Sequence, residues 1–306
     1  FIDVWTLLQR TAILLIFGLI VIPAFRMKFW NMGANGQVLV GCLAAIACMW
    51  FFTGKLPNAL IIVLMIVTSI LASMIWSVIP AIFKARFNTN ETLFTLMMNY
   101  IAIQLTCFFV AKWENPFGSN SVGIINSNTK AGWLPNLLSE GYNKDYGWNV
   151  ILVLIITLVM YLYMNRSKQG YEIAVIGDSV NTARYAGIRV NRAYVRTIII
   201  SGAICGLAGF IAVAGADHSI STSTAGGRGF TAIIVAWLAQ FNSIVMIIFS
   251  FLIVFLQKGA QAIASSYNLS QEVSEMITGI ILFFILGSEF FVNYKIRLNK
   301  GRKVSK

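Results

Sequence analysis

Nine apolar runs separated by short polar segments are the feature that most constrains the fold of this chain. A helix that crosses the hydrocarbon core of a membrane needs about 20 mostly apolar residues. Of the 306 residues, 58% are hydrophobic and only 11% are charged, with a mean hydropathy of +0.77, which leaves too little polar surface for a soluble domain. We therefore predict an integral membrane protein, with apolar runs at residues 7–25, 38–52, 59–83, 93–110, 149–164, 197–216, 229–241, 244–256 and 276–292.

These runs are predicted to be helices. An open sheet cannot satisfy its backbone hydrogen bonds in lipid, and the runs lack the alternation of barrel strands. The expected fold is an all-α, polytopic membrane bundle of roughly 8–10 spans. It forms a single transmembrane domain over residues 1–306. Runs 229–241 and 244–256 are short, so they are either two elements or two parts of one broken element.

The placement of the basic residues indicates the orientation. The chain has 23 Lys and Arg residues against 11 Asp and Glu, a formal charge of +12. If residues 165–196 form a cytoplasmic loop and the sides alternate from there, most bases fall inside, whereas Lys55, Lys112, Lys130 and Lys144 fall outside. Cytoplasmic loops of membrane proteins carry this excess. The charge therefore reflects orientation, and no nucleic-acid partner is expected.

Three polar regions outside the runs complete the organisation. Residues 112–148 are expected to form an external loop, either an irregular surface loop or a docking site for a delivery protein. Residues 293–306 form a basic cytoplasmic tail that contacts membrane lipid headgroups or is simply solvated. Alternation places residues 1–6 outside, and the chain begins with Phe1, so one further spanning helix is expected upstream.

The residue types argue against catalysis by this chain. The four cysteines lie within apolar runs, two of them in the run 38–52, without a CxxC pair, and are expected to be small core residues. His218 is the only histidine, and beside Asp217 it is expected to form a lone surface pair, because a zinc site needs three or four ligands. The sequence contains no phosphate-binding G-x-x-x-x-G-K-[ST] loop. We therefore expect neither an enzyme nor a bound cofactor.

Residues 170–195 form a polar, arginine-bearing insert between two apolar runs. Asp178 or Ser179 is a good N-cap for a short helix through Tyr185, and Gly187 is a good stop. Such a helix beside a membrane domain is typical of a docking element for a soluble partner. The Gly-Tyr-Glu run at 170–172 and the Ala-Arg-Tyr-Ala-Gly-Ile run at 183–188 resemble the cytoplasmic coupling loop of bacterial ABC importer permeases, most closely the nucleoside and simple-sugar branch.

This resemblance implies a type II-like importer domain in the bacterial plasma membrane. It implies a coupling loop that receives motion from an ABC ATP-binding subunit, where ATP and Mg²⁺ bind. It also implies a second homologous permease subunit and an extracellular solute-binding protein or lipoprotein. The residues implied to couple the chain to the ATP-binding subunit are Gly177, Asp178, Ala183, Arg184, Tyr185, Ala186 and Gly187.

Residues 31–37 are the first candidate for the solute pathway. Glycines at spacing three allow close backbone approach, and amides such as Asn31 and Gln37 can hydrogen-bond a polar solute or a neighbouring helix. The nucleoside branch has a similar Asn-x-Gly-Ala-Glu-Gly-Gln string. Asn35 stands where that string has the acid, so a role that needs charge there does not transfer.

The second candidate is a polar stripe in residues 91–102. Glu91, Thr95 and Asn99 recur at intervals of four and share one helix face. A polar stripe on a spanning helix faces the bundle interior, where it lines a solute path or forms a hydrogen-bonded seam between helices. The string also resembles the nucleoside branch more than its sugar relatives.

The third candidate is the Ser/Thr/Gly-rich segment 219–230, which precedes a half-length apolar run. Irregular backbone at membrane depth survives where it lines a cavity, although an ordinary external loop is the alternative. Arg228 and Phe230 offer a donor and a stacking face to a base or sugar. The family has an acid after Gly-Phe, whereas this chain has Thr231, so a carboxylate contact to ribose does not transfer.

The acids do not indicate ion-coupled transport. Glu91, Asp217, Glu272 and Glu275 lie at the edges of runs, whereas coupling acids are commonly buried in mid-span. We therefore interpret the chain as the permease subunit of an ABC nucleoside importer, powered by ATP hydrolysis in a separate subunit. The alternatives are a simple-sugar ABC permease and, from another class, a secondary transporter or channel.

Overall fold

Helices make up most of the part of the chain that the structure describes. The computed structural model describes residues 4–114, 118, 122–135, 137, 146–221 and 224–293. All nine predicted apolar runs fall largely within helices, so the predicted all-α membrane fold is confirmed. The helices are α1 (Val4–Arg26), α2 (Ala34–Phe52), α3 (Asn58–Phe87), α4 (Glu91–Trp113), α5 (Gly147–Arg166), α6 (Lys168–Asp178), α7 (Val180–Tyr185), α8 (Val190–Ala212), the π-helix η1 (Val213–Asp217), α9 (Arg228–Leu238), α10 (Val245–Ser266) and α11 (Gln271–Asn293).

Seven elements in the described residues are long and apolar enough to cross a membrane: α1 to α5, α8 continued by η1, and α10. The helix α9 is apolar but has only 11 residues. The chain divides into two compact units, Phe1–Leu252 and Ile253–Lys306. In the second unit, the last part of α10 is joined to α11 by a short turn in which the Leu269 N–H donates to the Ala264 carbonyl at 2.8 Å.

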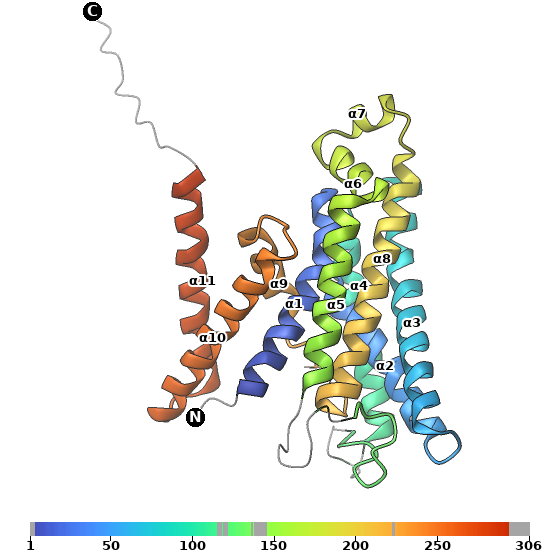
Figure 1. Cartoon of the computed structure of the whole chain (residues 1–306), viewed down its shortest axis with the longest axis vertical. Helices are drawn as coiled ribbons and strands as arrows, with labels where there is room; N and C mark the ends of the chain where they lie inside the picture. The colour runs from blue at the N-terminus through green and yellow to red at the C-terminus, as the bar shows by residue number, and fades with distance from the viewer. Residues whose placement is uncertain are drawn as a thin grey trace, which may run out of the picture. The chain divides into compact units, whose positions relative to one another are not determined.

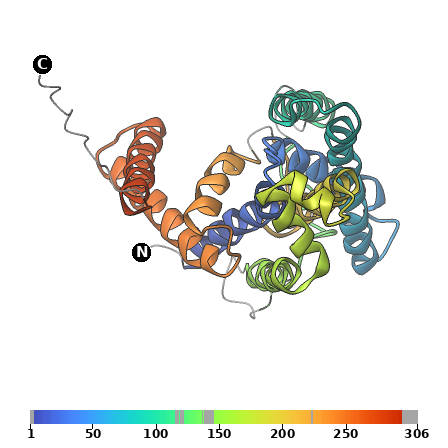
Figure 2. The ribbon, with the colours of Figure 1, turned by 90° about the horizontal axis from the view of Figure 1, so that it is seen from above.

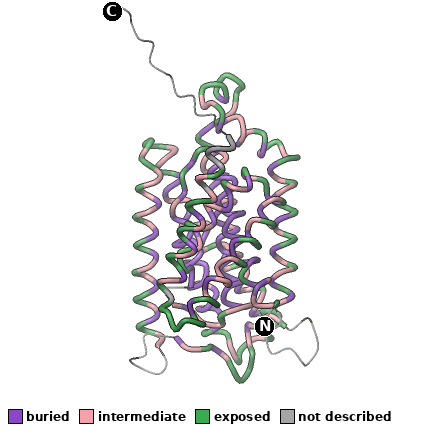
Figure 3. Tube along the Cα trace, turned by 90° about the vertical axis from the view of Figure 1, so that its left-hand side faces the viewer, coloured by how far each residue is buried: buried purple, intermediate pink, exposed green. Residues whose placement is uncertain are grey.

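In the first unit α1 is the central helix. Its most apolar stretch is 89% buried, against 22% for α3, 28% for α4 and 33% for α5. A helix that is apolar all round is stable when neighbours surround it, and α1 packs against α5, α8 and α9. Figure 3 shows this concentration of buried residues in the inner helices. The outer helices present large apolar side chains such as Leu71 and Ile75, as lipid-facing surfaces do.

The helices α3 and α8 make the most extensive contact in the bundle, and they meet through small residues. Ser69, Ser73 and Ser77 are fully buried and recur every four residues along one face of α3. Gly202 and Gly206 of α8 lie against this stripe, so close that a Cβ on either glycine would meet α3 atoms. Because lipid tails are as apolar as leucine, close backbone approach between small residues is what holds such helices together.

The two ends of the first unit differ in charge. The helices α6 and α7 lie at one end of the bundle (Figures 1 and 2), together with Arg26, Lys84, Arg86 and Arg166 at the ends of α1, α3 and α5. The opposite end carries the α2–α3 turn with Lys55 and the described loop residues 122–135. By the positive-inside rule, the end with α6 and α7 is expected to face the cytoplasm.

Candidate functional site

The predicted coupling loop folds into the two short helices α6 and α7. Ser167 caps α6, because its Oγ accepts the Gly170 N–H at 2.9 Å. Ser179 caps α7 by accepting the Thr182 N–H at 3.3 Å, whereas Asp178 is the last residue of α6. Of the two predicted caps for the helix that ends at Tyr185, the structure therefore selects Ser179. The preceding helix α6 was not predicted.

Gly187 ends α7 in the way its sequence position predicts. Its φ of +77° lies in the left-handed region that glycine adopts readily. The Gly187 N–H donates to the Arg184 carbonyl at 3.0 Å, and the Ile188 N–H donates to the Ala183 carbonyl at 2.9 Å. These bonds satisfy carbonyls that a short helix would otherwise leave unpaired.

The surface of α7 is open. Ala183 is fully buried beneath the helix, whereas the Tyr185 side chain is 94% exposed and Arg184, Ala186 and Gly187 are also exposed. An aromatic ring with so little protein around it is a typical anchor of an interface. Figure 1 shows α7 at the extreme end of the first unit.

The α6 helix is attached to three spanning helices. It follows α5 after a single residue, Ser167. Gly177 packs against the backbone of Arg26 at the end of α1, and a Cβ at this position would meet the Arg26 carbonyl. Glu172 forms a salt bridge of 2.7 Å with Arg196 of α8. A displacement of α6 and α7 would therefore act on α1, α5 and α8 together.

The predicted pathway residues Asn31, Gln37 and Thr95 lie together in a buried polar seam. Asn31 Nδ2 donates to Gln37 Oε1 at 3.2 Å, and the Met32 N–H donates to Thr95 Oγ1 at 3.1 Å. Cys205 Sγ of α8 also lies 3.2 Å from Gln37 Oε1. The three predicted residues are at most 2% exposed. The structure thus brings them together as a hydrogen-bonded seam among α2, α4 and α8.

Asn99 differs from its neighbours in the seam. It is only 5% exposed, and its Oδ1 atom is buried without a hydrogen-bond partner among the described residues. A Cβ on Gly36 would lie 2.9 Å from Asn99 Oδ1, so α2 and α4 approach closely here. A buried amide oxygen without a partner is unfavourable by about 1–3 kcal/mol. Asn99 therefore has an acceptor available for a polar group.

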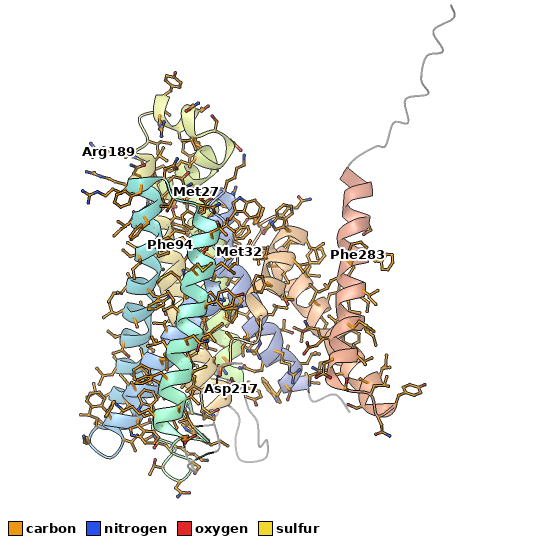
Figure 4. All side chains as sticks on the ribbon, turned by 180° about the vertical axis from the view of Figure 1, so that it is seen from behind. Met27, Met32, Phe94, Arg189, Asp217 and Phe283 are labelled. Atoms are coloured by element: carbon orange, nitrogen blue, oxygen red, sulfur yellow. The ribbon has the colours of Figure 1, made fainter. Side chains whose placement is uncertain are left out.

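The segment before α9 brings a helix N-terminus to this seam. Gly227, with a φ of +68°, is the N-cap of α9, and the Gly229 N–H donates to Asn35 Oδ1 at 2.9 Å. Asn35 lies in the first turn of α2, so two helix N-termini meet. In Figure 4, Met32 lies farther than Met27 from the end that carries α6 and α7, so α2 begins inside the bundle. The run 229–241 forms the half-length helix α9, and the run 244–256 lies in the separate helix α10, so the two short runs are two elements.

Arg228 and Phe230 are placed differently from each other. Arg228 is partly buried, and its Nη1 donates to the Thr224 carbonyl at 3.2 Å. Phe230 is 50% exposed, so its ring is not part of the buried seam. Their separation follows from the helix, because residues two apart lie on different faces.

His218 is not the exposed partner of Asp217 that the sequence suggested. Its ring stacks on Trp133 of the described loop, with centroids 3.7 Å apart and an interplanar angle of 4°. Burial disfavours the imidazolium and lowers the pKa of His218 to about 4. The Ile125 N–H donates to the His218 carbonyl at 3.0 Å, so this loop is attached to the outer end of η1.

Comparison with known proteins adds independent information. The sequence pattern described as "branched-chain amino acid transport system / permease component" matches residues 4–286. The guanosine ABC transporter permease protein NupP of Bacillus subtilis is 29% identical over 286 residues, covering 93% of this chain and 80% of the relative. The nucleoside permease NupB of Lactococcus lactis is 25% identical, covering 97% and 82%. The glucose permease TsgB13 of Haloferax volcanii is 24% identical, covering 97% and 79%.

Proposed function

The chain belongs to the family of permease components of branched-chain amino acid transport systems, and from this premise we propose that it imports nucleosides as the membrane-spanning subunit of an ABC importer. It is a multi-pass transport component, not an enzyme. The observation that carries the proposal is the exposed helix α7 on α6, which is attached to α1, α5 and α8. The guanosine and nucleoside relatives support the nucleoside class, and the glucose relative supports a sugar importer as the second candidate.

The proposed energy input is an ATP-binding subunit docked on α7. Tyr185 and Arg184 supply an exposed ring and cation for that contact. ATP and Mg²⁺ bind in the partner, and this chain binds no cofactor. Movement of the partner displaces Asp178 and the residues of α7, and α6 passes it to α1 through Gly177 and to α8 through Glu172 and Arg196. Such rigid-body rocking of helix groups is a common form of alternating access.

The proposed solute path runs beside the seam where α2 and α9 begin. Asn99 offers an unpaired buried acceptor, which suits an N–H or O–H group of a nucleoside. Asn31, Gln37 and Thr95 hold the walls of this region together, and Arg228 lies at the start of the half-length helix α9. Half-helices that begin at membrane depth are typical of solute sites in transporters.

The proposal includes two further partners in the plasma membrane of a bacterium. A second, homologous permease subunit completes the path, and an extracellular solute-binding protein delivers the nucleoside. The described outer loop supports a fixed delivery surface, because the N–H groups of residues 125 and 134 donate to the carbonyls of His218, which follows η1, and of Ala214 in η1.

Uptake by cells that express this chain with its neighbouring transporter genes tests the proposal. We expect radiolabelled guanosine to accumulate, and accumulation to stop when the ATP-binding subunit is inactivated. Accumulation of glucose or ribose without guanosine would move the chain to the sugar class. Uptake that persists without an active ATP-binding subunit would contradict the ABC mechanism and indicate a secondary transporter or channel.

Variants separate coupling from binding. Tyr185→Ala should lower uptake while the protein remains in the membrane. Because the ring is 94% exposed, its removal takes away little packing within the chain and should leave the fold intact. Arg166→Ala, an exposed change at the same end but outside α7, is the matched control. Normal uptake with Tyr185→Ala would contradict its docking role.

Asn99→Leu tests the solute path. We expect the KM for guanosine to rise about tenfold, the order of one lost hydrogen bond. Thr106→Val changes another buried polar residue of α4 whose hydroxyl already donates to the Ala102 carbonyl, and it should leave the KM unchanged. Equal effects of the two substitutions would assign Asn99 to packing alone.

A further inference from the structure

A groove on the outer face of the bundle lies between the cytoplasmic ends of α3 and α8. Its volume is about 550 Å³, within the range of roughly 300–1,000 Å³ that small-molecule sites occupy. Its apolar wall consists of Ile82 and Ala85 of α3 and Val195, Ile199 and Ile200 of α8. Ile82 is 45% exposed although it lies within a predicted membrane span. The groove is therefore an apolar surface that opens sideways, where lipid surrounds the protein.

Three arginines lie along the cytoplasmic part of this groove. Arg86 lies in the last turn of α3, whereas Arg192 and Arg196 lie in the first turns of α8. Arg196 is neutralised by Glu172 at 2.7 Å. Arg86 and Arg192 are exposed and have no ion pair among the described residues. In Figure 4, nitrogen-tipped side chains project outward at this end of the bundle, around the labelled Arg189. The groove thus has two cations available for an anion.

The order of these residues along the helices separates charge from apolar surface. On α8, Arg192, Val195, Arg196 and Ile199 recur at three- and four-residue intervals and so share one face. Seven residues of helix separate Arg192 from Ile199, which corresponds to about 10 Å along the axis. On α3, Ile82 likewise lies one turn deeper than Arg86. The groove therefore has cations at the membrane surface and apolar side chains on the part that extends towards the hydrocarbon core.

We propose that this groove binds an anionic phospholipid of the cytoplasmic leaflet. The phosphate lies between Arg86 and Arg192, whose guanidinium groups bind phosphate oxygens in pairs, and an acyl chain lies along Ile82 and Ile199. Basic pockets between spanning helices on the cytoplasmic side suit anionic headgroups. A soluble phosphate would leave the apolar wall uncovered, and a docked protein would need an apolar segment inside the bilayer. The site does not depend on which solute the chain transports.

The position of the groove gives the lipid a consequence for the coupling element. Arg196 forms part of the groove and also holds α6 through Glu172. A bound acyl chain would pack against Val195 and Ile199 on either side of Arg196 and so restrict the α8 turn that carries the salt bridge. The lipid would therefore stiffen the attachment of α6 and α7 to the bundle.

Native mass spectrometry of the purified full chain tests this proposal. The protein is released from detergent after incubation with phosphatidylglycerol or, as the zwitterionic control, phosphatidylcholine. We expect one phosphatidylglycerol to be retained preferentially. Arg86→Gln and Arg192→Gln should each weaken retention about fivefold, the order expected for one arginine near a lipid surface. Arg166→Gln removes an exposed cation at the same end outside the groove and should have no effect.

A variant that fills the apolar part distinguishes a groove from a charged surface. Ala85→Phe leaves Arg86 and Arg192 in place but fills the apolar part of the groove. It should lower phosphatidylglycerol retention as much as the arginine variants do. Inorganic phosphate should not displace the lipid. Equal retention of both lipids, a loss with Arg166→Gln equal to that with Arg86→Gln, or full retention by Ala85→Phe would overturn the proposal. The proposal would also be overturned if, in a complex free of lipid, a second protein subunit covered Arg86 and Arg192.

Discussion

At the scale of single residues, the stacked pair of His218 and Trp133 makes a prediction about acid. The pKa of His218 is lowered from 6.5 to about 4 because burial disfavours its charged form. Unfolded or released His218 binds its proton more readily, so the pair is fully stable above about pH 6.5 and is weakened as the pH falls towards 4. We expect Trp133 fluorescence to change over that interval, as the loop separates from the end of η1.

His218→Asn supplies the control for this titration. Asparagine tolerates the left-handed backbone that His218 adopts, with a φ of 47°, and does not titrate between pH 4 and 7. The fluorescence difference between the original chain and the variant isolates the His218 contribution from the other tryptophans. A pH response of equal size in both proteins would assign it to other groups.

The buried amides were predictable as polar residues of the bundle interior, but their partners were not. Asn31 and Gln37 are six residues apart and hydrogen-bond to each other, whereas the motif that contains them predicted bonds to a solute or to a neighbouring helix. Asn35, however, accepts a hydrogen bond from Gly229, 194 positions away. No periodicity links two such residues, because their contact depends on how α9 packs against α1 and α2. The sequence also suggested Phe230 and Arg228 together as solute contacts, yet Phe230 is half-exposed.

At the scale of elements, Gly187 determines where α7 ends. Its φ of +77° is unfavourable for other residues by roughly 1–2 kcal/mol, and more for a β-branched one. No atom lies within 4 Å of a Cβ built there, so the effect of substitution is conformational and not steric. Gly187→Val should fray α7 and accelerate trypsin cleavage after Arg184, whereas Gly187→Asn should change it much less. Mass spectrometry of the fragments identifies the cleaved bond, and equal cleavage rates in the two variants would contradict this account.

The contact between α3 and α8 makes a second prediction for an element. A Cβ on Gly206 would lie 2.5 Å from Ile70 Cα, and backbone cannot yield as a flexible side chain does. Gly206→Ala should therefore destabilise the protein by roughly 1–3 kcal/mol, as overpacking does. The matched control is Gly259→Ala in α10, where a Cβ meets nothing within 4 Å and alanine favours the helix by up to about 1 kcal/mol. The midpoints of thermal unfolding in detergent compare the two variants. Equal midpoints would contradict the prediction, because they would show that α3 and α8 accommodate the added methyl group without loss of stability.

The sequence predicted α7 well and missed α6 for a physical reason. Ser179 and Gly187 are strong start and stop signals with nothing ambiguous between them. The α6 segment contains Gly170 and Gly177, which lower helix propensity. Both glycines are there because backbone atoms of α5 and α1 leave no room for a Cβ. Tertiary packing therefore stabilises α6 as a helix although its local helix propensity is low.

At the scale of the whole molecule, the sequence predicted the helices and their charge asymmetry but not which helices form the centre. The apolar stretches of α1 and α3 have mean hydropathies of 2.0 and 2.6, yet 89% of one and 22% of the other is buried. In lipid, an apolar helix is stable both against protein and against acyl chains, so hydropathy carries little information about position. Small residues such as the serine stripe of α3 indicate which face of a helix contacts a neighbour, but α3 itself is not central.

The orientation of the whole molecule follows from charge and is open to a direct test. The end that carries α7 and most bases is expected inside the cell, and the α2–α3 turn outside. Cys107 is the one exposed cysteine among the described residues, so Cys107→Ala provides a background of low reactivity. In this background, Lys55→Cys should react with a membrane-impermeant maleimide in intact cells. Tyr185→Cys, at a position 94% exposed, should react only after the cells are opened.

The unsubstituted Cys107→Ala protein gives the baseline, because Cys42, Cys48 and Cys205 are buried. Labelling of Tyr185→Cys in intact cells would show that the orientation is the reverse of the predicted one. That outcome would place α7 where no ATP is available and so would exclude an ATP-binding partner on this helix. It would also move the groove of Arg86 and Arg192 to the outer leaflet. Labelling confined to Lys55→Cys would instead put the coupling element and the proposed lipid site on the side where both of their partners are found.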